Sequence, residues 1–143
     1  MHTVYFSLGS NLGCRKRNLR KAIEMIGERV GNVVRQSSLY ETEPWGYESE
    51  HRFLNAAVCV ETELSPREVL AKTQQIEREM GRKEKSAGTG GYADRPIDID
   101  ILLYDRLTLD EPDLKIPHPL MYLREFVMKP LGEILQDDIK NEE

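Results

Sequence analysis

The segment from Ile97 to Tyr104 reads Ile-Asp-Ile-Asp-Ile-Leu-Leu-Tyr and alternates apolar and acidic residues over most of its length. Successive side chains of a β-strand point to opposite faces of the sheet. The alternation therefore predicts a strand whose core-facing set is Ile97, Ile99, Ile101 and Leu103. Asp98 and Asp100 are then predicted to lie together on the opposite face.

Three further strands are predicted upstream, at Thr3–Leu8, Val33–Thr42 and Phe53–Thr62. Between them, apolar residues spaced three and four apart predict two helices. The first runs from about Leu19 to Val30. The second begins at Ser65-Pro66-Arg67-Glu68, which has the form of a capping box with proline at the first helical position, and Gly81 can end it.

The resulting order is strand, helix, strand, strand, helix, strand, which is typical of the ferredoxin-like α+β sandwich. Its antiparallel sheet carries helices on one face and leaves the other face to loops and ligand. Residues from Pro112 to Pro119 are predicted to be irregular. A short C-terminal helix is predicted after Pro130. The 143 residues show no internal repeat or boundary, so a single domain spanning residues 1–143 is expected.

The composition, 39% hydrophobic and 31% charged, is typical of a soluble globular protein. A net charge of −5 argues against a nucleic-acid partner, although a local basic cluster can still bind a small anion. No apolar run is long enough to span a membrane, and the start of the chain reads as a strand rather than a signal peptide. Cys14 and Cys59 lack disulfide or metal-site spacing. We therefore expect a cytoplasmic protein, and a monomer because no apolar stripe is left over after the core is assigned.

The same alternation applies to the Phe53–Thr62 strand, in which Phe53 and Asn55 share the face opposite the apolar set. This is the open face that carries Asp98 and Asp100. Two carboxylates at alternate strand positions are about 6–7 Å apart at Cα, and they repel unless a cation lies between them. Magnesium prefers such oxygen ligands together with phosphate and water. The alternative is the solvated face of an amphipathic strand, and the pattern alone does not separate the two.

Basic residues bracket a glycine-containing loop just before the acidic strand, namely Arg82, Lys83, Lys85 and Arg95. Such a cluster suits triphosphate binding, although charge runs are more often solvated surface. Phe53 and Phe126 are candidate stacking surfaces for a flat heterocycle, although core packing is commoner for phenylalanine. The Asn55 amide can read the edge of a pterin or purine. His118 is a candidate phosphate ligand or a surface histidine.

Several stretches together resemble one family over nearly the whole chain. They are Gly9–Leu12, Ser38–Gly46, Phe53–Val58, Glu77 with Gly81-Arg82, Asp94–Leu103, Ile116–Pro119 and Arg124–Val127. In this order they resemble 6-hydroxymethyl-7,8-dihydropterin pyrophosphokinase. The Arg-Pro-Ile-Asp-Ile-Asp run and the Pro-His-Pro run are its most specific parts.

The resemblance implies a ferredoxin-like fold, ATP as co-substrate and two magnesium ions bound by Asp98 and Asp100. It implies a catalytic set of Arg82, Arg95, Asp98 and Asp100. The pterin-binding residues it implies are Thr42, Pro44, Trp45, Phe53, Asn55 and Phe126. The ATP-binding residues it implies are Gln74, Glu77, Arg82, Arg95, Ile101, His118 and Arg124.

This sequence departs from the family pattern after Gly81, where several arginines and a tryptophan are expected. Glu84, Ser86, Gly88 and Thr89 stand there instead, and Tyr92 is a candidate for the lid role of the missing tryptophan.

The hypothesis is that the pterin hydroxymethyl oxygen attacks the β-phosphorus of ATP and AMP leaves, with rate supplied by positioning and charge neutralisation. The rival is a non-catalytic regulatory module of the same shape that binds a nucleotide or an amino acid. Paired aspartates on the ligand side favour the enzyme, because a regulatory module has no need of them.

Overall fold

The computed structural model describes residues 1–43, 51–81 and 94–142, and for residues 136–142 it describes the backbone alone. The strands are β1 (His2–Ser10), β2 (Asn32–Gln36), β3 (Tyr40–Thr42), β4 (Phe53–Thr62), β5 (Asp98–Tyr104), β6 (Leu109–Glu111) and β7 (Leu114–Ile116). The helices are α1 (Arg15–Arg29), α2 (Pro66–Glu79) and α3 (Glu125–Glu142), preceded by the 3-10 turn η1 (Met121–Leu123). Within the described ranges, no helix combines the length and apolar character that crossing a bilayer requires.

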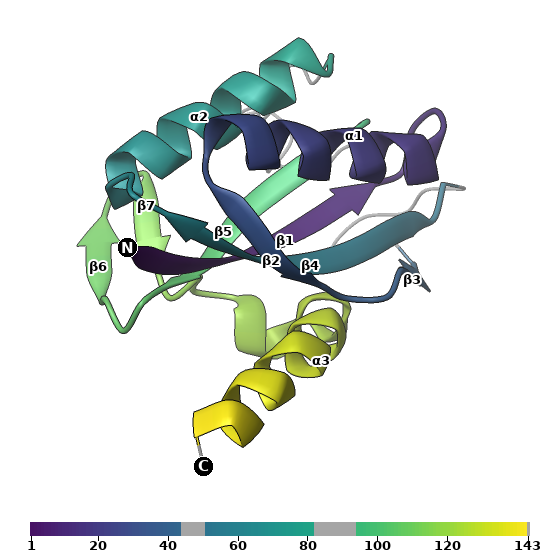
Figure 1. Ribbon diagram of the computed structural model, residues 1–143. Helices are drawn as coiled ribbons and strands as arrows, with labels where there is room; N and C mark the ends of the chain where they lie inside the picture. Colours follow the sequence, from purple (N-terminus) through teal and green to yellow (C-terminus); the bar gives the residue numbers. More distant parts are fainter. Residues whose placement is uncertain (44–50, 82–93, 143) are drawn as a thin grey trace.

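The main sheet has the strand order β2-β4-β1-β5 with antiparallel neighbours, and the short strand β3 pairs with β4. Helices α1 and α2 cover one face of this sheet, and α3 lies against the other face (Figure 1). The order and the helix layer are those of the predicted ferredoxin-like sandwich. The added feature is α3, which covers part of the second face and leaves the rest for a site.

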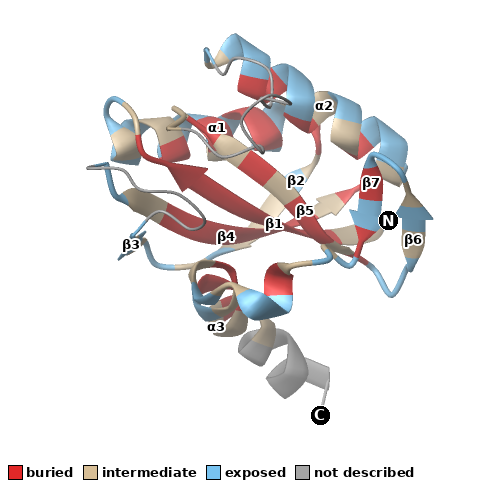
Figure 2. Cartoon of the chain, turned by 180° about the vertical axis from the view of Figure 1, so that it is seen from behind, coloured by how far each residue is buried: buried red, intermediate tan, exposed pale blue. Residues whose placement is uncertain are grey.

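The main core lies between the sheet and helices α1 and α2, where the central strands are almost entirely buried (Figure 2). The predicted strand Thr3–Leu8 is confirmed as part of β1, and its apolar residues Val4, Phe6 and Leu8 are completely buried in this core. The predicted capping box is also confirmed, since Glu68 N donates to Ser65 Oγ and Ser65 N donates to Glu68 Oε1.

The alternation in β5 holds for Ile97, Ile99 and Ile101, which join the core under α1 and α2. For Leu103 the prediction was wrong. The register with β1 shifts between the pairs Phe6↔Ile101 and Tyr5↔Leu103, so Leu102 is an extra residue. A bulge of this kind turns two consecutive side chains to one face. Leu102 and Leu103 consequently both pack on the α3 side.

The predicted single strand Val33–Thr42 was also wrong, because it divides into β2 and β3. At the break the Ser37 hydroxyl accepts a hydrogen bond from Ala57 N at 2.8 Å, so a side chain replaces a backbone carbonyl in the ladder. The segment Pro112–Pro119, predicted to be irregular, contains β7 and part of the hairpin that it forms with β6.

The C-terminal helix was predicted to begin after Pro130, but α3 begins at Glu125 and Pro130 lies inside it. Pro130 lies in the second turn of α3, where its missing N–H removes one backbone hydrogen bond without ending the helix. Leu131 and Ile134 face inward, and they pack against the second face of the sheet.

Candidate functional site

A pocket opens on the second face of the sheet, beside the start of α3, and we call it the sheet pocket. Its lining residues are Ser7, Gly9, Thr42, Glu43, Phe53, Asn55, Arg95, Asp98, Asp100, Arg124 and Phe126. The predicted residues Thr42, Phe53, Asn55, Arg95, Asp98, Asp100, Arg124 and Phe126 are therefore brought together here. They come from strands β3, β4 and β5 and from the segments that precede β5 and begin α3.

Strand register explains how the sheet pocket assembles. Gly9 pairs with Asn55 on one side and with Asp98 on the other, and Ser7 pairs with Asp100. A Cβ added at Gly9 would lie 3.1 Å from Asn55 Oδ1 and 3.4 Å from Phe53 Cδ1. The missing side chain thus keeps the floor of the pocket clear.

Sequence reasoning missed Ser7, Gly9 and Glu43 as lining residues. Two of them carried a usable signal. Ser7 and Gly9 alternate with the inward residues Phe6 and Leu8, so parity in the first strand places both on the open face.

Asn55 is 2% exposed, and hydrogen bonds fix the orientation of its side chain. Its Nδ2 donates to Thr42 Oγ1 at 2.6 Å and to the backbone oxygen of Tyr40 at 3.3 Å. The Tyr40 carbonyl can only accept, so the atom facing it must be the amide nitrogen. The oxygen Oδ1 therefore faces the Gly9 side and presents an acceptor to the pocket.

Two arginines lie beside the two aromatic rings of the pocket. The Arg95 guanidinium carbon is 5.7 Å from the centroid of Phe53, and that of Arg124 is 5.6 Å from the centroid of Phe126. Arg95 Nη1 also lies 3.4 Å from Asp98 Oδ2, with side-chain exposures of 12% and 21%. A partly buried positive charge thus accompanies the carboxylate pair, which suits an anionic ligand.

Asn11 holds the backbone of Arg95 and was not predicted to do so. Its Oδ1 accepts from Arg95 N at 2.7 Å, and its own backbone N donates to Arg95 O at 3.0 Å. Its Nδ2 donates to Asp94 Oδ1 at 2.7 Å and to His51 O at 3.1 Å. Gly9 and Ser10 still belong to β1, and Asn11 begins the turn to α1 and joins three segments of the chain next to Arg95.

A second pocket, the hairpin pocket, lies between α2, β5 and the β6-β7 hairpin. Its lining residues are Leu70, Gln74, Glu77, Ile99, Asp100, Ile101, Pro112, Asp113, Leu114, Lys115, His118 and Pro119. The predicted ATP residues Gln74, Glu77, Ile101 and His118 meet here. The hairpin residues were missed because the hairpin itself was not predicted.

The two pockets differ in size and share one residue. The cavity volume is about 50 Å³ in the sheet pocket and about 370 Å³ in the hairpin pocket. The larger value falls in the usual range for small-molecule sites, and the smaller one holds only one or two waters. Asp100 lines both pockets, so a group held between them would meet this carboxylate.

Buried polar groups fix the wall between the pockets. Glu77 is 5% exposed, and its Oε2 accepts from Ile99 N at 2.9 Å, which ties α2 to the residue between the two aspartates. His118 N donates to the carbonyl of the bulge residue Leu102 at 3.1 Å. His118 Nδ1 accepts from Leu120 N at 3.3 Å, so the neutral ring carries its proton on Nε2.

The donor set at Asp98 and Asp100 fits a hard divalent cation, because two carboxylates share one face of β5 beside the hairpin pocket. Among the residues that the structure describes, no group of three or more histidine, cysteine, aspartate or glutamate side chains could hold a metal. Magnesium in proteins usually completes one or two carboxylate ligands with phosphate oxygens and water. The predicted residues Pro44, Trp45, Arg82 and Tyr92 lie outside the described residues.

Comparison with known proteins gives a consistent result. The sequence model of the family described as 7,8-dihydro-6-hydroxymethylpterin-pyrophosphokinase (HPPK) matches residues 5–136. A Porphyromonas gingivalis protein named 2-amino-4-hydroxy-6-hydroxymethyldihydropteridine pyrophosphokinase is 53% identical over 135 residues, which cover 94% of this chain and 91% of that protein. A Bacillus subtilis protein of the same name is 44% identical over 134 residues, which cover 93% and 78% of the two chains.

Solved structures agree on the fold. A crystal structure of a Plasmodium falciparum HPPK-DHPS triple mutant matches with a TM-score of 0.71 at 18% identity. The match covers 92% of this chain and 40% of that longer chain. At this identity the likeness concerns the architecture of the matched part.

Proposed function

This chain belongs to the 7,8-dihydro-6-hydroxymethylpterin-pyrophosphokinase family, and from that premise we propose which of its residues carry the reaction. The enzyme transfers a diphosphate group from ATP to the hydroxymethyl group of 6-hydroxymethyl-7,8-dihydropterin. The products are AMP and the pterin diphosphate, and the step belongs to folate biosynthesis.

The pterin binds in the sheet pocket, with Phe53 and Phe126 stacking on its faces. The Asn55 oxygen accepts a hydrogen bond from the N–H edge of the ring. This role is supported by the hydrogen bonds that the Asn55 nitrogen donates to Thr42 and Tyr40, which leave the oxygen on the pocket side. A cavity of about 50 Å³ is too small for a bicyclic ring. We propose that the rings or the adjoining arginines move outward when the pterin binds.

ATP binds in the hairpin pocket with its base and ribose among apolar and amide side chains of α2, β5 and the hairpin, and its triphosphate extends toward Asp100. His118 Nε2–H donates to a phosphate oxygen, which its fixed tautomer supports. Arg95 and Arg124 hold phosphate oxygens and compensate the charge that develops on them. Pro44 and Trp45 would complete the pterin site, and Arg82 would add a further phosphate contact.

In the chemical step the hydroxymethyl oxygen forms a bond to the β-phosphorus, and the bond from that phosphorus to the α,β-bridging oxygen breaks. AMP leaves with the bonding electron pair, and the hydroxyl proton is released. Asp98 and Asp100 would hold magnesium, which when bound neutralises phosphate charge and favours the deprotonated hydroxyl. We propose two ions. The side chains of the two pockets orient the substrates and exclude water, and positioning supplies much of the rate.

One observation carries the assignment, namely that Asp100 lines both pockets. A pterin in the sheet pocket and an ATP in the hairpin pocket therefore meet at the carboxylate pair, where the transferred group must pass.

The test is incubation with ATP, magnesium and the hydroxymethyl dihydropterin, followed by chromatography of the nucleotides. AMP and pterin diphosphate are expected, whereas ADP would indicate a plain kinase. ATP binding without turnover would favour the regulatory module. The isosteric variants Asp98→Asn and Asp100→Asn test the site. Glu79→Gln is the matched control, because it removes a carboxylate that pairs with Arg29 between the two helices, away from both pockets.

We also propose that residues 1–143 act as one domain, as a monomer and in the cytoplasm. The monomer is supported by a main core that is closed by the sheet and two helices. Light scattering at enzyme-assay concentrations tests it, and a mass of twice the chain would refute it.

A further inference from the structure

We propose that Glu133 of α3 and Tyr40 of β3 form a latch that positions Asn55 and Thr42 for binding of the pterin. Neither latch residue is among the described residues that line the sheet pocket. The inference rests on the proposed placement of the pterin in that pocket.

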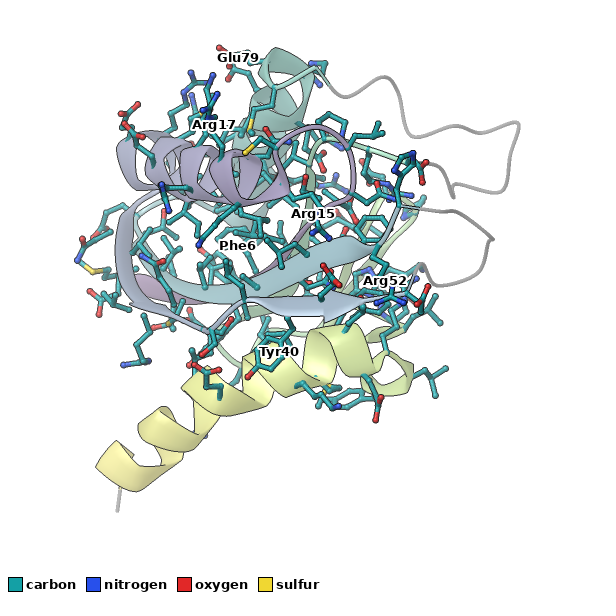
Figure 3. All side chains as sticks on the ribbon, turned by 90° about the vertical axis from the view of Figure 1, so that its right-hand side faces the viewer. Phe6, Arg15, Arg17, Tyr40, Arg52 and Glu79 are labelled. Carbon is teal, nitrogen blue, oxygen red and sulfur yellow. The ribbon has the colours of Figure 1, made fainter. Side chains whose placement is uncertain are left out.

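The latch is a compact set of hydrogen bonds between parts of the chain that are far apart in sequence. Tyr40 Oη donates to Glu133 Oε1 at 2.6 Å. Ser38 N donates to both carboxylate oxygens, at 3.1 and 2.9 Å, and Ser38 Oγ donates to Oε2 at 3.3 Å. Figure 3 shows the Tyr40 ring between the sheet and α3. Hydrogen bonds to a charged carboxylate are stronger than those between neutral groups, so this contact fixes the distance from β3 to the helix.

On the strand side the latch reaches Asn55 through Tyr40 itself. Tyr40 pairs with Asn55 in the sheet, and its backbone oxygen accepts from Asn55 Nδ2 at 3.3 Å. Two residues further along the same short strand, Thr42 accepts from the same nitrogen at 2.6 Å. Any shift of Tyr40 along or away from β4 therefore changes both bonds that orient the Asn55 amide.

On the helix side the latch lies on the same face of α3 as the stacking ring. Glu133 follows Phe126 by about two helical turns, and residues at that spacing share a face. Phe126 lines the sheet pocket and packs against the second core cluster. The latch thus connects α3, whose Phe126 stacks on the pterin, with β3, whose Tyr40 and Thr42 orient the Asn55 amide that binds the pterin edge.

The need for such a device follows from the size of β3. It has three residues and pairs with β4 alone among the described strands. A short edge strand has few ladder bonds and opens locally at low cost. A side-chain anchor to a helix on the sheet face supplies the restraint that the ladder lacks. Loss of the anchor should therefore impair pterin recognition more than it impairs the ATP site, which lies on the other side of β5.

The test compares Tyr40→Phe, Glu133→Ala and the double variant by calorimetry. The pterin Kd is measured in the presence of magnesium and a non-hydrolysable ATP analogue, and the Kd of the analogue is measured alone. Tyr40→Phe should raise the pterin Kd about tenfold, the effect of one lost hydrogen bond. Glu133→Ala should raise it at least as much, because that change also removes the bonds from Ser38. The Kd of the analogue should change less than twofold. The double variant should bind pterin no more weakly than Glu133→Ala alone, because Glu133→Ala already removes the only contact that Tyr40→Phe removes.

Two controls separate the latch from a general loss of structure. Glu133→Gln keeps an acceptor oxygen and should recover part of the affinity. Arg29→Ala breaks the Arg29–Glu79 ion pair between α1 and α2 and should leave both affinities unchanged. In the wild-type enzyme, the side-chain amide resonances of Asn55 should differ from those in Tyr40→Phe, while thermal melting confirms that the variant is folded.

An unchanged pterin Kd in a folded Tyr40→Phe variant would overturn the latch, and so would a parallel loss of pterin and nucleotide affinity. A wild-type enzyme that binds the analogue but no pterin would overturn the pocket assignment and the latch with it. Absence of AMP formation with normal pterin binding would count against the proposed chemistry, while the binding comparison would still decide the latch.

Discussion

Gly9→Ala provides a sharp test of the sheet pocket, because the change adds one methyl group to its floor. The new Cβ would lie 3.1 Å from Asn55 Oδ1, 3.4 Å from Phe53 Cδ1 and 3.8 Å from Phe53 Cε1. Each contact involves a residue that we assign to the pterin. The backbone of Gly9 itself has no positive φ, so alanine brings crowding rather than backbone strain.

The expected size of the effect follows from what must move. A 3.1 Å contact requires a shift of a few tenths of an ångström, and Asn55 is held by bonds of 2.6 and 3.3 Å to β3. Adding a methylene to a packed site costs about 1–3 kcal/mol. Misplacing the Asn55 oxygen would cost about 1 kcal/mol of ligand hydrogen bonding. The crowding is already present in the free enzyme and therefore lowers its stability, whereas the lost ligand hydrogen bond of about 1 kcal/mol predicts a pterin Kd raised roughly fivefold.

The assay is calorimetric binding of the pterin with an ATP analogue present, together with steady-state KM values for both substrates. Gly132→Ala in α3 is the matched control, because a Cβ there would meet nothing within 4 Å. It should leave both affinities unchanged and stabilise the fold by up to about 1 kcal/mol through helix propensity. A folded Gly9→Ala enzyme with wild-type pterin affinity would refute the placement of the pterin against Asn55 and Phe53.

Three other perturbations have defined outcomes. Asp98→Asn and Asp100→Asn should each lower kcat by about 100-fold or more without lowering the melting temperature, because they remove cation ligands from a repelling pair; turnover near wild type in both would contradict the metal assignment. Gly31→Ala should destabilise the fold by about 1–3 kcal/mol or more in denaturant titrations, because its Cβ would overlap the carbonyl of Glu61; an unchanged midpoint would be inconsistent with this packing. The Tyr40 hydroxyl, which donates to Glu133, lowers the pKa of that carboxyl. The hydrogen bond to the ionised Glu133 carboxylate therefore stabilises the fold fully above the ordinary glutamate pKa of about 4.3. This stabilisation is lost as the pH falls through the lower pKa that Glu133 has in the folded protein. The difference in unfolding free energy between wild type and Glu133→Gln should accordingly shrink below about pH 4, and a difference that grows in acid would reverse the assignment.

Local patterns were sufficient to predict most of the sheet and one wall of the site. Alternation around Phe53 and Asp98 placed the aromatic ring, the amide and both carboxylates on one face, because each strand is regular there. The same rule failed at Leu103. Nothing in the local sequence marks the register shift, which depends on how β5 meets β1.

Other features were missed because they depend on contacts between distant segments. The role of Asn11 arises from its approach to Arg95, 84 residues away in sequence. Glu133 became significant only when α3 was placed against β3, and its helix began five residues before Pro130, where the start was expected. The local sequence around Asn11 indicates only a turn, and that around Glu133 indicates only a helix. Neither local sequence predicts the contact with Arg95 or with Tyr40.

The bulge at Leu102 explains how one face of β5 can line the sheet pocket at one end and pack against α3 at the other. Before the bulge, β5 alternates strictly, so Asp98 and Asp100 face the sheet pocket. At the bulge the strand turns two leucines toward α3, and the helix can cover the sheet from that point onward. The freed carbonyl of Leu102 accepts from His118 N and brings that ring to the hairpin pocket. Bulges occur often beside active sites because they redirect side chains in this way. Here the irregularity sets the boundary between the part of the second face that α3 buries and the part that lines the sheet pocket.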